Sequence, residues 1–469
     1  MNSNVLDDKL HEECGVVGIY TESKESTSQL LYYGLYALQH RGQESAGIAV
    51  MDESEVQFHK AMGLVPEIFN AENLNALNGS IGIGHVRYST TGESFVRNAQ
   101  PLVVKYKHGS ISLAHNGNLV NASTLREVLE DSGALFQTTI DTEVIATLIA
   151  KYHKNGIVKA VQKAMELVKG SYALVMTAED KLIGVRDNFG IRPLCLGQLD
   201  DGYVLASESC ALDAMGAEFI RDIEPGEIVV VDKNGIESIK SNKVCAKRSC
   251  VFELIYFARP DSTIDGTNVY VSRHEAGKIL ANESAVDADI VIAVPDSGIA
   301  AAIGYAEQSG IPYGVGLIKN KYIGRTFIQP DQALREQGVK IKLNVLKENV
   351  EGKRVIIIDD SIVRGTTSKH LVEILKKAGA KEVHMRISSP PVKYTCHFGI
   401  DTPYRKHLVG ANKSVDEICE MIGADSLAFI SIEGLRKATG EKDVFCKACF
   451  DGQYPMEVPR EGMNGKDEE

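Results

Sequence analysis

The pattern of apolar and polar positions divides the chain into two halves. Before about residue 240, short apolar segments typical of β-strands predominate, and helical spacing is confined to a few places. The pattern predicts strands at 15–20, 45–50, 80–85, 111–115, 172–176, 182–185, 203–206 and 227–231, and helices at 26–38, 141–152 and 157–168. A strand-rich chain with its helices grouped together favours an α+β sandwich.

From about Cys250 onward, helical and strand-like segments alternate. Helices are predicted at 272–284, 298–309 and 366–378, and strands at 289–294, 313–317, 355–358 and 382–388. This alternation indicates an α/β fold with a doubly wound parallel sheet. The polar segment 238–248 separates the two patterns. We therefore place a first domain at 14–245, a second at 246–455 and a charged, flexible tail at 456–469.

The segment 355–368 carries the most chemical information. Four apolar β-branched residues form a buried strand, and Asp359 and Asp360 follow at its C-terminal end. A polar loop then leads into an amphipathic helix, whose N–H groups and dipole suit a phosphate. Paired carboxylates suit sugar hydroxyls or Mg²⁺. The segment matches neither of the common glycine-rich nucleotide loops. It resembles the loop of type I phosphoribosyltransferases that binds 5-phosphoribosyl 1-pyrophosphate (PRPP), although a buried strand with an acidic turn is the plainer alternative.

The resemblance implies a role for each residue of this loop and of two others. Asp359 and Asp360 would contact the ribose hydroxyls directly or through Mg²⁺. The 5-phosphate would be held by Ser361, Arg364, Gly365, Thr366 and Thr367. The segment 294–298 resembles the pyrophosphate loop, with Ser297 also near the metal; an ordinary helix N-cap is the alternative there. The segment 317–330 resembles the mobile loop that closes over PRPP, with Lys319, Lys321 and Arg325 as its pyrophosphate contacts.

A second constellation begins at Cys14, which directly precedes a glycine-containing strand. The segments 38–47, 84–90, 114–118 and 141–143 follow it in an order that resembles the class II glutamine amidotransferases, whose fold is that of the N-terminal-nucleophile (Ntn) hydrolases. In that family the nucleophile is the first residue of the mature chain, because its free α-amine acts as the general base. The resemblance therefore implies that residues 1–13 are a propeptide; an extension without function is the alternative.

Further roles follow from the same resemblance. Arg87 would pair with the glutamine α-carboxylate and Asp141 with its α-ammonium. Asn116 and the Gly117 N–H would form the oxyanion hole. His85 and Thr90 would line the pocket. For Arg41 and Gly42, a structural role is as consistent with the sequence as a catalytic one.

A glutaminase followed by a PRPP domain resembles the amidophosphoribosyltransferase family. This implies that glutamine-derived ammonia attacks C1 of PRPP, giving 5-phosphoribosylamine, glutamate and pyrophosphate, the first committed step of purine (IMP) synthesis. It also implies a homotetramer and feedback inhibition by purine nucleotides. Candidate walls of an ammonia path are Tyr88, Tyr256, Phe327 and Ile328. A PRPP-binding regulator without catalysis is the main alternative; the loop at 359–367 argues against a sugar isomerase or synthetase.

Four of the nine cysteines stand in contexts that match one branch of this family. These are Cys250, Cys396, Cys446 and Cys449, the last two forming a Cys-x-x-Cys pair. In the iron–sulfur branch, which also has the propeptide, such residues hold a [4Fe-4S] cluster. Spacing alone would favour tetrahedral Zn²⁺, and the absence of any metal is the other alternative. Apart from Cys14, the other cysteines match no such role; they are Cys195, Cys210, Cys245 and Cys419.

Composition narrows the setting. The chain has 469 residues, of which 44% are hydrophobic and 24% charged, and a formal net charge of −12, which argues against non-specific binding to nucleic acid. An acidic N-terminus and the lack of a long apolar run predict neither a secretory signal nor a membrane span. We therefore expect a cytoplasmic protein with reduced cysteines.

Overall fold

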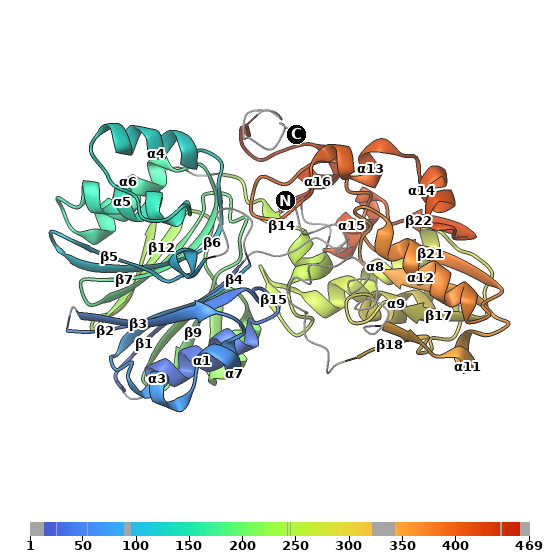
Figure 1. Ribbon diagram of the computed structural model, residues 1–469, viewed down its shortest axis with the longest axis horizontal. Helices are drawn as coiled ribbons and strands as arrows, with labels where there is room; N and C mark the ends of the chain where they lie inside the picture. Colours follow the sequence, from blue (N-terminus) through green and yellow to red (C-terminus); the bar gives the residue numbers. More distant parts are fainter. Residues whose placement is uncertain are drawn as a thin grey trace.

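The computed structural model describes residues 14–459 except 25, 54, 89–94, 242, 244, 321–342, 441 and 442. The chain forms two lobes that lie side by side (Figure 1). The passage between them falls between β13 (Gly235–Lys240) and β14 (Ser249–Cys250). Within the described residues, no helix is both long and apolar enough to cross a bilayer.

The first lobe is a sandwich of two antiparallel sheets. The seven-stranded sheet has the order β11-β9-β10-β1-β4-β2-β3, and the six-stranded sheet β13-β12-β8-β7-β6-β5. The strands of the first are β1 (Cys14–Thr21), β2 (Ser45–Asp52), β3 (Glu55–Met62), β4 (Ile81–Arg87), β9 (Cys195–Leu199), β10 (Gly202–Ala206) and β11 (Glu218–Asp222). The second also contains β5 (Leu102–Tyr106), β6 (Gly109–Leu119), β7 (Gly170–Ala178), β8 (Lys181–Arg186) and β12 (Glu227–Asp232).

Helices cover the outer face of each sheet, so the lobe has four layers. The seven-stranded sheet packs against α1 (Thr27–Ala37), α2 (Val65–Ile68), α3 (Ala71–Asn75) and α7 (Ser209–Met215); the six-stranded sheet packs against α4 (Ala122–Asp131), α5 (Thr142–Tyr152) and α6 (Ile157–Leu167). A third apolar cluster, including Val16, Ile83 and Val175, fills the space between the sheets. The α+β sandwich predicted from the sequence is therefore confirmed.

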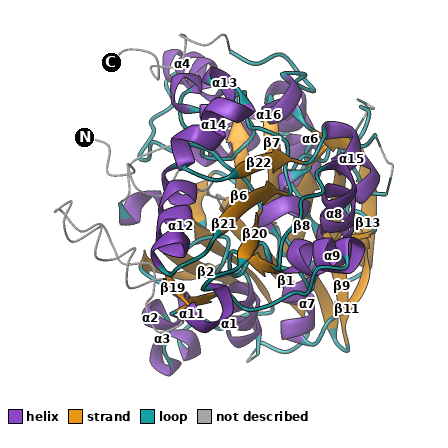
Figure 2. Ribbon diagram, turned by 90° about the vertical axis from the view of Figure 1, so that its right-hand side faces the viewer, coloured by secondary structure: helices purple, strands orange, loops and turns teal. Residues whose placement is uncertain are grey.

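The second lobe is built on a parallel sheet in the order β17-β20-β21-β22. Its strands are β17 (Ile290–Ala293), β20 (Arg354–Asp359), β21 (Glu382–Ile387) and β22 (Ser426–Phe429). Alternate residues of β20 enter different cores: Ile356 and Ile358 pack with α8 (Val269–Glu283), α9 (Ile299–Ser309) and α15 (Ile432–Ala438), whereas Val355 and Ile357 pack with α12 (Thr366–Lys377) and α14 (Val415–Ile422). Figure 2 shows these two helix groups on opposite sides of the strands, which confirms the doubly wound sheet.

One predicted strand lies elsewhere. Residues 313–317 were predicted to join the parallel sheet, but only Tyr313 forms a bridge, to Val291. The strand in this region is β18 (Leu317–Lys319), which pairs with β19 (Leu343–Val345) in a separate antiparallel ribbon. Glycines at 314 and 316 pack directly on Ile290 and Ile292, so the chain crosses β17 without forming a ladder.

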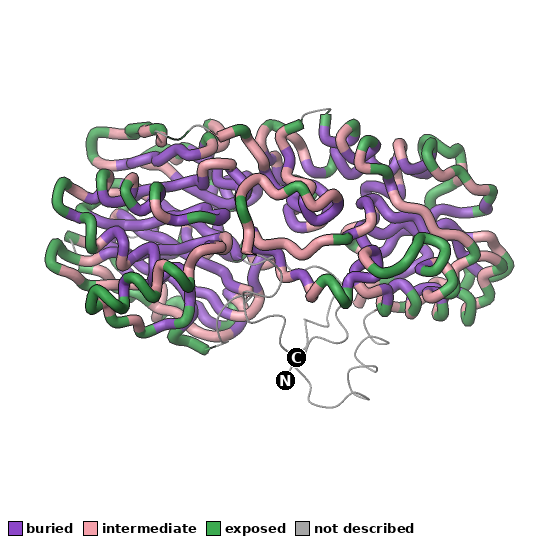
Figure 3. Tube along the Cα trace, turned by 90° about the horizontal axis from the view of Figure 1, so that it is seen from above, coloured by how far each residue is buried: buried purple, intermediate pink, exposed green. Residues whose placement is uncertain are grey.

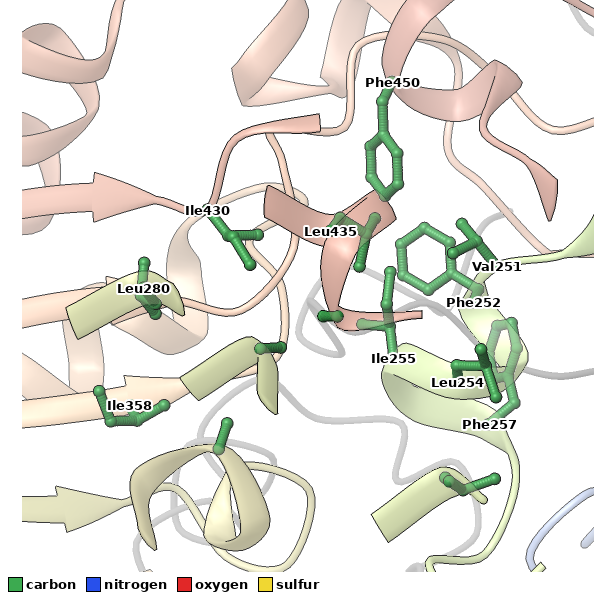
Figure 4. Packing of buried hydrophobic residues seen from close by; sticks show 14 of the residues in the cluster. Val251, Phe252, Leu254, Ile255, Phe257, Leu280, Ile358, Ile430, Leu435 and Phe450 are labelled. Carbon is green, nitrogen blue, oxygen red and sulfur yellow. The ribbon is translucent and has the colours of Figure 1, made fainter. Parts of the chain in front are cut away.

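Short elements complete the chain. They are η1 (Val96–Asn98), the π-helical turn η2 (Glu253–Phe257), β15 (Thr263–Ile264), β16 (Thr267–Asn268), α11 (Lys347–Val350), η3 (Arg405–His407), α13 (Val409–Asn412), β23 (Phe445–Cys446) and α16 (Ala448–Asp451). Of the short strands, β14 and β15 lie near the junction of the lobes (Figure 1). Figure 4 shows Phe252 and Leu435 beside Ile255, and the Phe450 ring packs on that of Phe252 with the centroids 5.4 Å apart. In Figure 3, buried backbone continues through the interior of both lobes.

We predict that Gly277→Ala destabilises the second lobe. A Cβ atom at Gly277 of α8 would lie 1.9 Å from the Ala301 carbonyl oxygen of α9, so the helices would have to separate. Overpacking of this kind costs about 1–3 kcal/mol, measurable as a lower urea midpoint. The control, Glu307→Ala, alters a 56% exposed side chain on the same helix pair and should have little effect. Equal midpoints for the two variants would contradict the close-packing argument.

Candidate glutaminase and phosphoribosyl sites

Cys14, Arg87 and Ser45 form a row across three neighbouring strands. Cys14 of β1 is the cross-strand partner of Arg87 of β4, and Arg87 is the partner of Ser45 of β2. Cross-strand partners present their side chains on the same face, which here is the face toward the six-stranded sheet. All three residues are buried, Cys14 with 7% exposure. The apolar layer between the sheets therefore ends in this row of polar side chains, in which a thiol and a guanidinium group are neighbours.

His85 lies on the same face, two residues before Arg87. Its Nε2 is 3.1 Å from the His115 carbonyl oxygen, to which it donates, and Nδ1 has no hydrogen-bond partner among the described residues. Burial lowers its pKa to about 3, so the ring is neutral at physiological pH. A neutral imidazole can line the pocket without adding to the charge of Arg87.

The opposite sheet contributes Asn116 and Gly117, both on β6. Asn116 is fully buried, and neither atom of its amide has a hydrogen-bond partner among the described residues. Leaving both atoms unpaired is costly unless a ligand completes them. Gly117 has a φ of +142°, and a Cβ there would lie 2.2 Å from the Ser171 carbonyl oxygen. The position therefore requires glycine, and the pair is suited to stabilising an oxyanion.

Asp141 lies immediately before α5. Its Oδ2 accepts a hydrogen bond from the Leu119 N–H at 2.9 Å, and its Oδ1 is 3.3 Å from Nδ1 of His115. Burial alone would raise its pKa, but His115 and the backbone donors outweigh burial and hold the pKa below its usual range. The carboxyl group thus remains ionised, as a partner for an ammonium group must.

Lys60 was missed by the sequence analysis. Its ammonium donates to the carbonyl oxygens of Ala99 at 2.6 Å and Pro101 at 3.4 Å, on either side of Gln100. Gln100 in turn accepts from the His115 N–H at 2.8 Å. Lys60 therefore supports the loop that holds the strand of Asn116. No motif marks a lysine on β3, because its partners are backbone atoms from a distant segment.

Arg41, whose role the sequence left open, has a structural contact. Its guanidinium is 1% exposed and bonds Glu208 and, at 2.6 Å, Glu253 of the second lobe. Gly42 packs on the Arg87 backbone: a Cβ at this position would lie 2.5 Å from the Arg87 nitrogen. This segment therefore joins the nucleophile sheet to the second lobe.

In the second lobe, two turns meet at the carboxyl ends of adjacent parallel strands. Asp359 ends β20, and Asp360 and Ser361 follow it; all three are buried. Asp360 N–H bonds the Asp359 carboxylate at 2.9 Å, and the Ser361 hydroxyl bonds Asp360 at 2.7 Å. The turn after β17 lies beside them, since the Val294 N–H donates to the Ile358 carbonyl at 2.9 Å. Ligands bind at such strand ends in open α/β sheets.

The start of α12 completes the anion-binding geometry. Gly365 takes the left-handed conformation, with a φ of +85°, at the N-cap, and Thr366 and Thr367 open the first turn. The twelve-residue helix directs its first N–H groups and its dipole at the turn. Across the turn, Lys319 bonds Asp296 at 2.8 Å, so the mobile-loop and pyrophosphate-loop segments touch.

The four motif cysteines, far apart in sequence, line one cavity. Its lining is Ile191, Cys250, Cys396, Phe398, Ile400, Cys446, Ala448, Cys449 and Tyr454. Burial raises the pKa of Cys446 to about 12 and those of Cys250 and Cys449 well above the usual range. Within the described residues no set of three or more His, Cys, Asp or Glu is drawn together as closely as a metal site requires. The sulfur-only donor set nevertheless fits an iron–sulfur cluster or Zn²⁺.

Ser297 follows β17 and Arg364 lies just before α12, and both predicted PRPP-site residues are half-buried. Tyr88 follows β4 and Tyr256 lies in η2, and both are half-buried. The remaining predicted site residues lie outside the described residues: Thr90, Lys321, Arg325, Phe327, Ile328 and residues 1–13.

We predict that Lys60→Met removes a pH dependence of stability. Burial, aided by nearby Arg87, lowers the pKa of Lys60 from about 10.5 to about 8. Between these values the unfolded chain binds one more proton than the folded chain, so stability contributed by Lys60 rises with pH. The Tm of wild type minus that of the variant should therefore increase from pH 7.5 to 9.5. A constant or falling difference would contradict the assignment; other groups cancel in the subtraction.

Comparison with known proteins agrees with this geometry. Residues 85–214 match a model described as a glutamine amidotransferase domain, and residues 271–388 match a phosphoribosyl transferase domain. An amidophosphoribosyltransferase of Archaeoglobus fulgidus is 54% identical over 96% of this chain and 99% of its own, and one of Bacillus subtilis 50% identical over 96% and 95%.

A solved structure extends the similarity to three dimensions. It is the glutamine PRPP amidotransferase from B. subtilis complexed with ADP and GMP, with a TM-score of 0.90 and 49% identity over 95% of this chain and 98% of that one. Sequence identity near one half over almost the full length, together with both domains in the same order, leaves one assignment. The chain belongs to the amidophosphoribosyltransferase family.

Proposed function

We propose that the two sites act in sequence, the first releasing ammonia from glutamine and the second adding it to PRPP. The products are 5-phosphoribosylamine, glutamate and pyrophosphate, in the first committed step of purine synthesis. The observation that carries this is the row of Cys14 and Arg87 opposite the Asn116 amide, which has no partner within the described part of the chain, together with the Asp359–Asp360 turn. A nucleophile, a carboxylate-binding cation and an oxyanion donor are what a glutaminase needs.

In the first half-reaction the Cys14 thiol attacks the δ-carbon of glutamine. Once residues 1–13 are removed, the α-amine of Cys14 takes the thiol proton and passes it to the departing ammonia. Arg87 and Asp141 hold the α-carboxylate and α-ammonium, His85 and Thr90 line the pocket, and Asn116 with the Gly117 N–H stabilises the oxyanion. Water then cleaves the γ-glutamyl thioester to glutamate.

In the second half-reaction ammonia attacks C1 of PRPP and pyrophosphate leaves. Asp359 and Asp360 hold the ribose hydroxyls, and the 5-phosphate lies at Ser361, Arg364, Gly365, Thr366 and Thr367. Lys319 and Arg325 hold the pyrophosphate. Buried carboxylates at a phosphate site are hard oxygen ligands, so Ser297, Asp359 and Asp360 suit one Mg²⁺ per subunit, which when bound neutralises the pyrophosphate charge.

The cysteine cavity is proposed to hold one [4Fe-4S] cluster per subunit, which places the chain in the iron–sulfur branch with a propeptide. The four thiols that line one cavity support this, because a set of four cysteine sulfurs is the usual ligand set of a [4Fe-4S] cluster. Reduced thiols of this kind persist in the cytoplasm, where we place the protein. Purine nucleotides as inhibitors are supported by the ADP and GMP of the B. subtilis complex. A homotetramer is proposed from the family alone.

Cys14→Ala should abolish phosphoribosylamine formation from glutamine while leaving formation from free ammonia nearly intact. The reason is that the second site needs only ammonia, whereas the first loses its nucleophile. Product is measured with each nitrogen source at saturating PRPP. N-terminal sequencing of the active wild type should begin at Cys14, and active protein that still begins at Met1 would refute the propeptide.

The same assay distinguishes the proposed enzyme from a regulator that binds PRPP without catalysis. A PRPP-binding regulator would form no phosphoribosylamine from ammonia, with or without Cys14. A Cys195→Ala variant is the matched control, because it removes another buried thiol of the same sheet and should keep both activities.

Anaerobically purified protein should contain about four iron atoms per chain and absorb broadly in the visible range. Cys446→Ser should lose both the iron and the colour, since it removes one of the four thiols. Cys419→Ser changes a thiol outside the cavity and should retain them. Bound zinc in colourless wild-type protein would overturn the cluster.

A further inference from the structure

A short segment of the second lobe is hydrogen-bonded to the strand of the oxyanion hole. The Asn118 side chain donates to the His397 carbonyl oxygen at 2.9 Å, and the Ser171 hydroxyl donates to the Phe398 carbonyl oxygen at 2.7 Å. Asn118 and Ser171 are themselves cross-strand partners on β6 and β7. We call residues 396–398 the strap.

The strap bonds reach the backbone directly beside the hole. The Asn118 N–H donates to the Ser171 hydroxyl at 3.3 Å, so Ser171 links the Phe398 carbonyl to the peptide that follows Gly117. At Gly117 the two strands approach so closely that no Cβ fits between them. A shift of Ser171 would therefore move the peptide units on both sides of Gly117.

Two further hydrogen bonds hold the strap, one of them from Arg192 of the first lobe. The buried Arg192 guanidinium donates to the Phe398 carbonyl oxygen at 3.1 Å, and the Phe398 N–H donates to Cys396 Sγ at 3.3 Å. Phe398 is 2% exposed in the core of the junction. The Phe398 carbonyl group, which accepts from both Arg192 and Ser171, is thus held in place beside β7.

We propose that Asn118 and Ser171 are positioning residues for the glutaminase reaction, through which the strap sets the direction of the Gly117 N–H and the Asn116 amide. The Asn116 amide has no hydrogen-bond partner among the described residues, so its direction depends on the backbone of β6. Oxyanion donors act on charge that exists only in the transition state. Misalignment should therefore lower kcat and leave KM for glutamine nearly unchanged. This inference rests on the proposed function.

The test compares Asn118→Ala and Ser171→Ala with wild type in the full-length protein. Each should lower the glutamine-dependent kcat about 10- to 100-fold, the size of effect seen when residues that orient metal ligands are removed, with KM within about twofold. Phosphoribosylamine formation from ammonia should be unchanged, which also verifies folding. Ser171→Ala decides the matter if Asn118→Ala loses the ammonia-dependent activity.

A second measurement separates positioning from general loosening. The γ-aldehyde analogue of glutamine adds the Cys14 thiol to its carbonyl, giving a tetrahedral thiohemiacetal whose oxygen occupies the hole. The inhibition constant of this analogue should rise by the same factor by which kcat/KM falls, because the adduct mimics the transition state. A rise in KM for glutamine with an unchanged inhibition constant would overturn the proposal.

Asn121→Ala is the matched control. Its amide bonds the Leu167 carbonyl at 3.0 Å and the Lys169 N–H at 2.8 Å, similar bonds near the same strand that stay within the first lobe. It should behave as wild type; an equal loss of kcat would overturn the proposal. If the proposed glutaminase function were wrong, the result would be different, because Cys14→Ala would then keep its glutamine-dependent activity. If Asn118→Ala and Ser171→Ala both kept the wild-type kcat while Cys14→Ala was inactive with glutamine, only the role of the strap would be refuted.

Discussion

One buried set of charges joins the two lobes, and the relation between the sites depends on it. Arg41 and Arg192 of the first lobe converge on Glu253, at distances of 2.6 and 3.4 Å, and Arg41 also bonds Glu208. All four side chains are at most 1% exposed. Two guanidinium groups face two carboxylates, so the cluster is balanced. Although burial would raise the pKa of Glu208, Arg41 and His40 hold it well below its usual range.

Such a cluster adds little net stability, but it favours one arrangement of the two lobes over others. Taking ions out of water offsets most of their attraction, yet removing a single partner costs about 3–5 kcal/mol because a charge is left buried. The lobes therefore have one favourable arrangement and costly alternatives. Glu253 opens η2, and Arg273 of α8 bonds the carbonyls of Leu254 and Ala258 at the same turn, both at 2.8 Å. The turn beside Tyr256 is thus held from both sides.

The sequence predicted what depends on neighbours in the chain. The apolar run before Asp359 forms the buried strand β20, and Gly365 has a positive φ at the start of α12; both features depend on residues close by in the chain. Contacts between distant segments were not predictable: Lys60 bonds backbone carbonyls at 99 and 101, and Glu253 pairs with arginines of another domain. The prediction of a strand at 313–317 was wrong for the same reason, because the path of this segment depends on its packing against Ile290 and Ile292.

Both sites lie where a buried strand ends, and this placement follows from the chemistry each must do. A strand end next to apolar layers offers unpaired backbone groups in a place that excludes water, where hydrogen bonds and charges act strongly. Cys14 begins β1 against the inter-sheet core, and Asp359 ends β20 between two helical layers. Ammonia released at the first end would be protonated in water before it reached the second. The buried charges at Glu253 join the two lobes and so fix the two strand ends relative to each other, and the strap at 396–398 adds hydrogen bonds from the second lobe to β6 and β7.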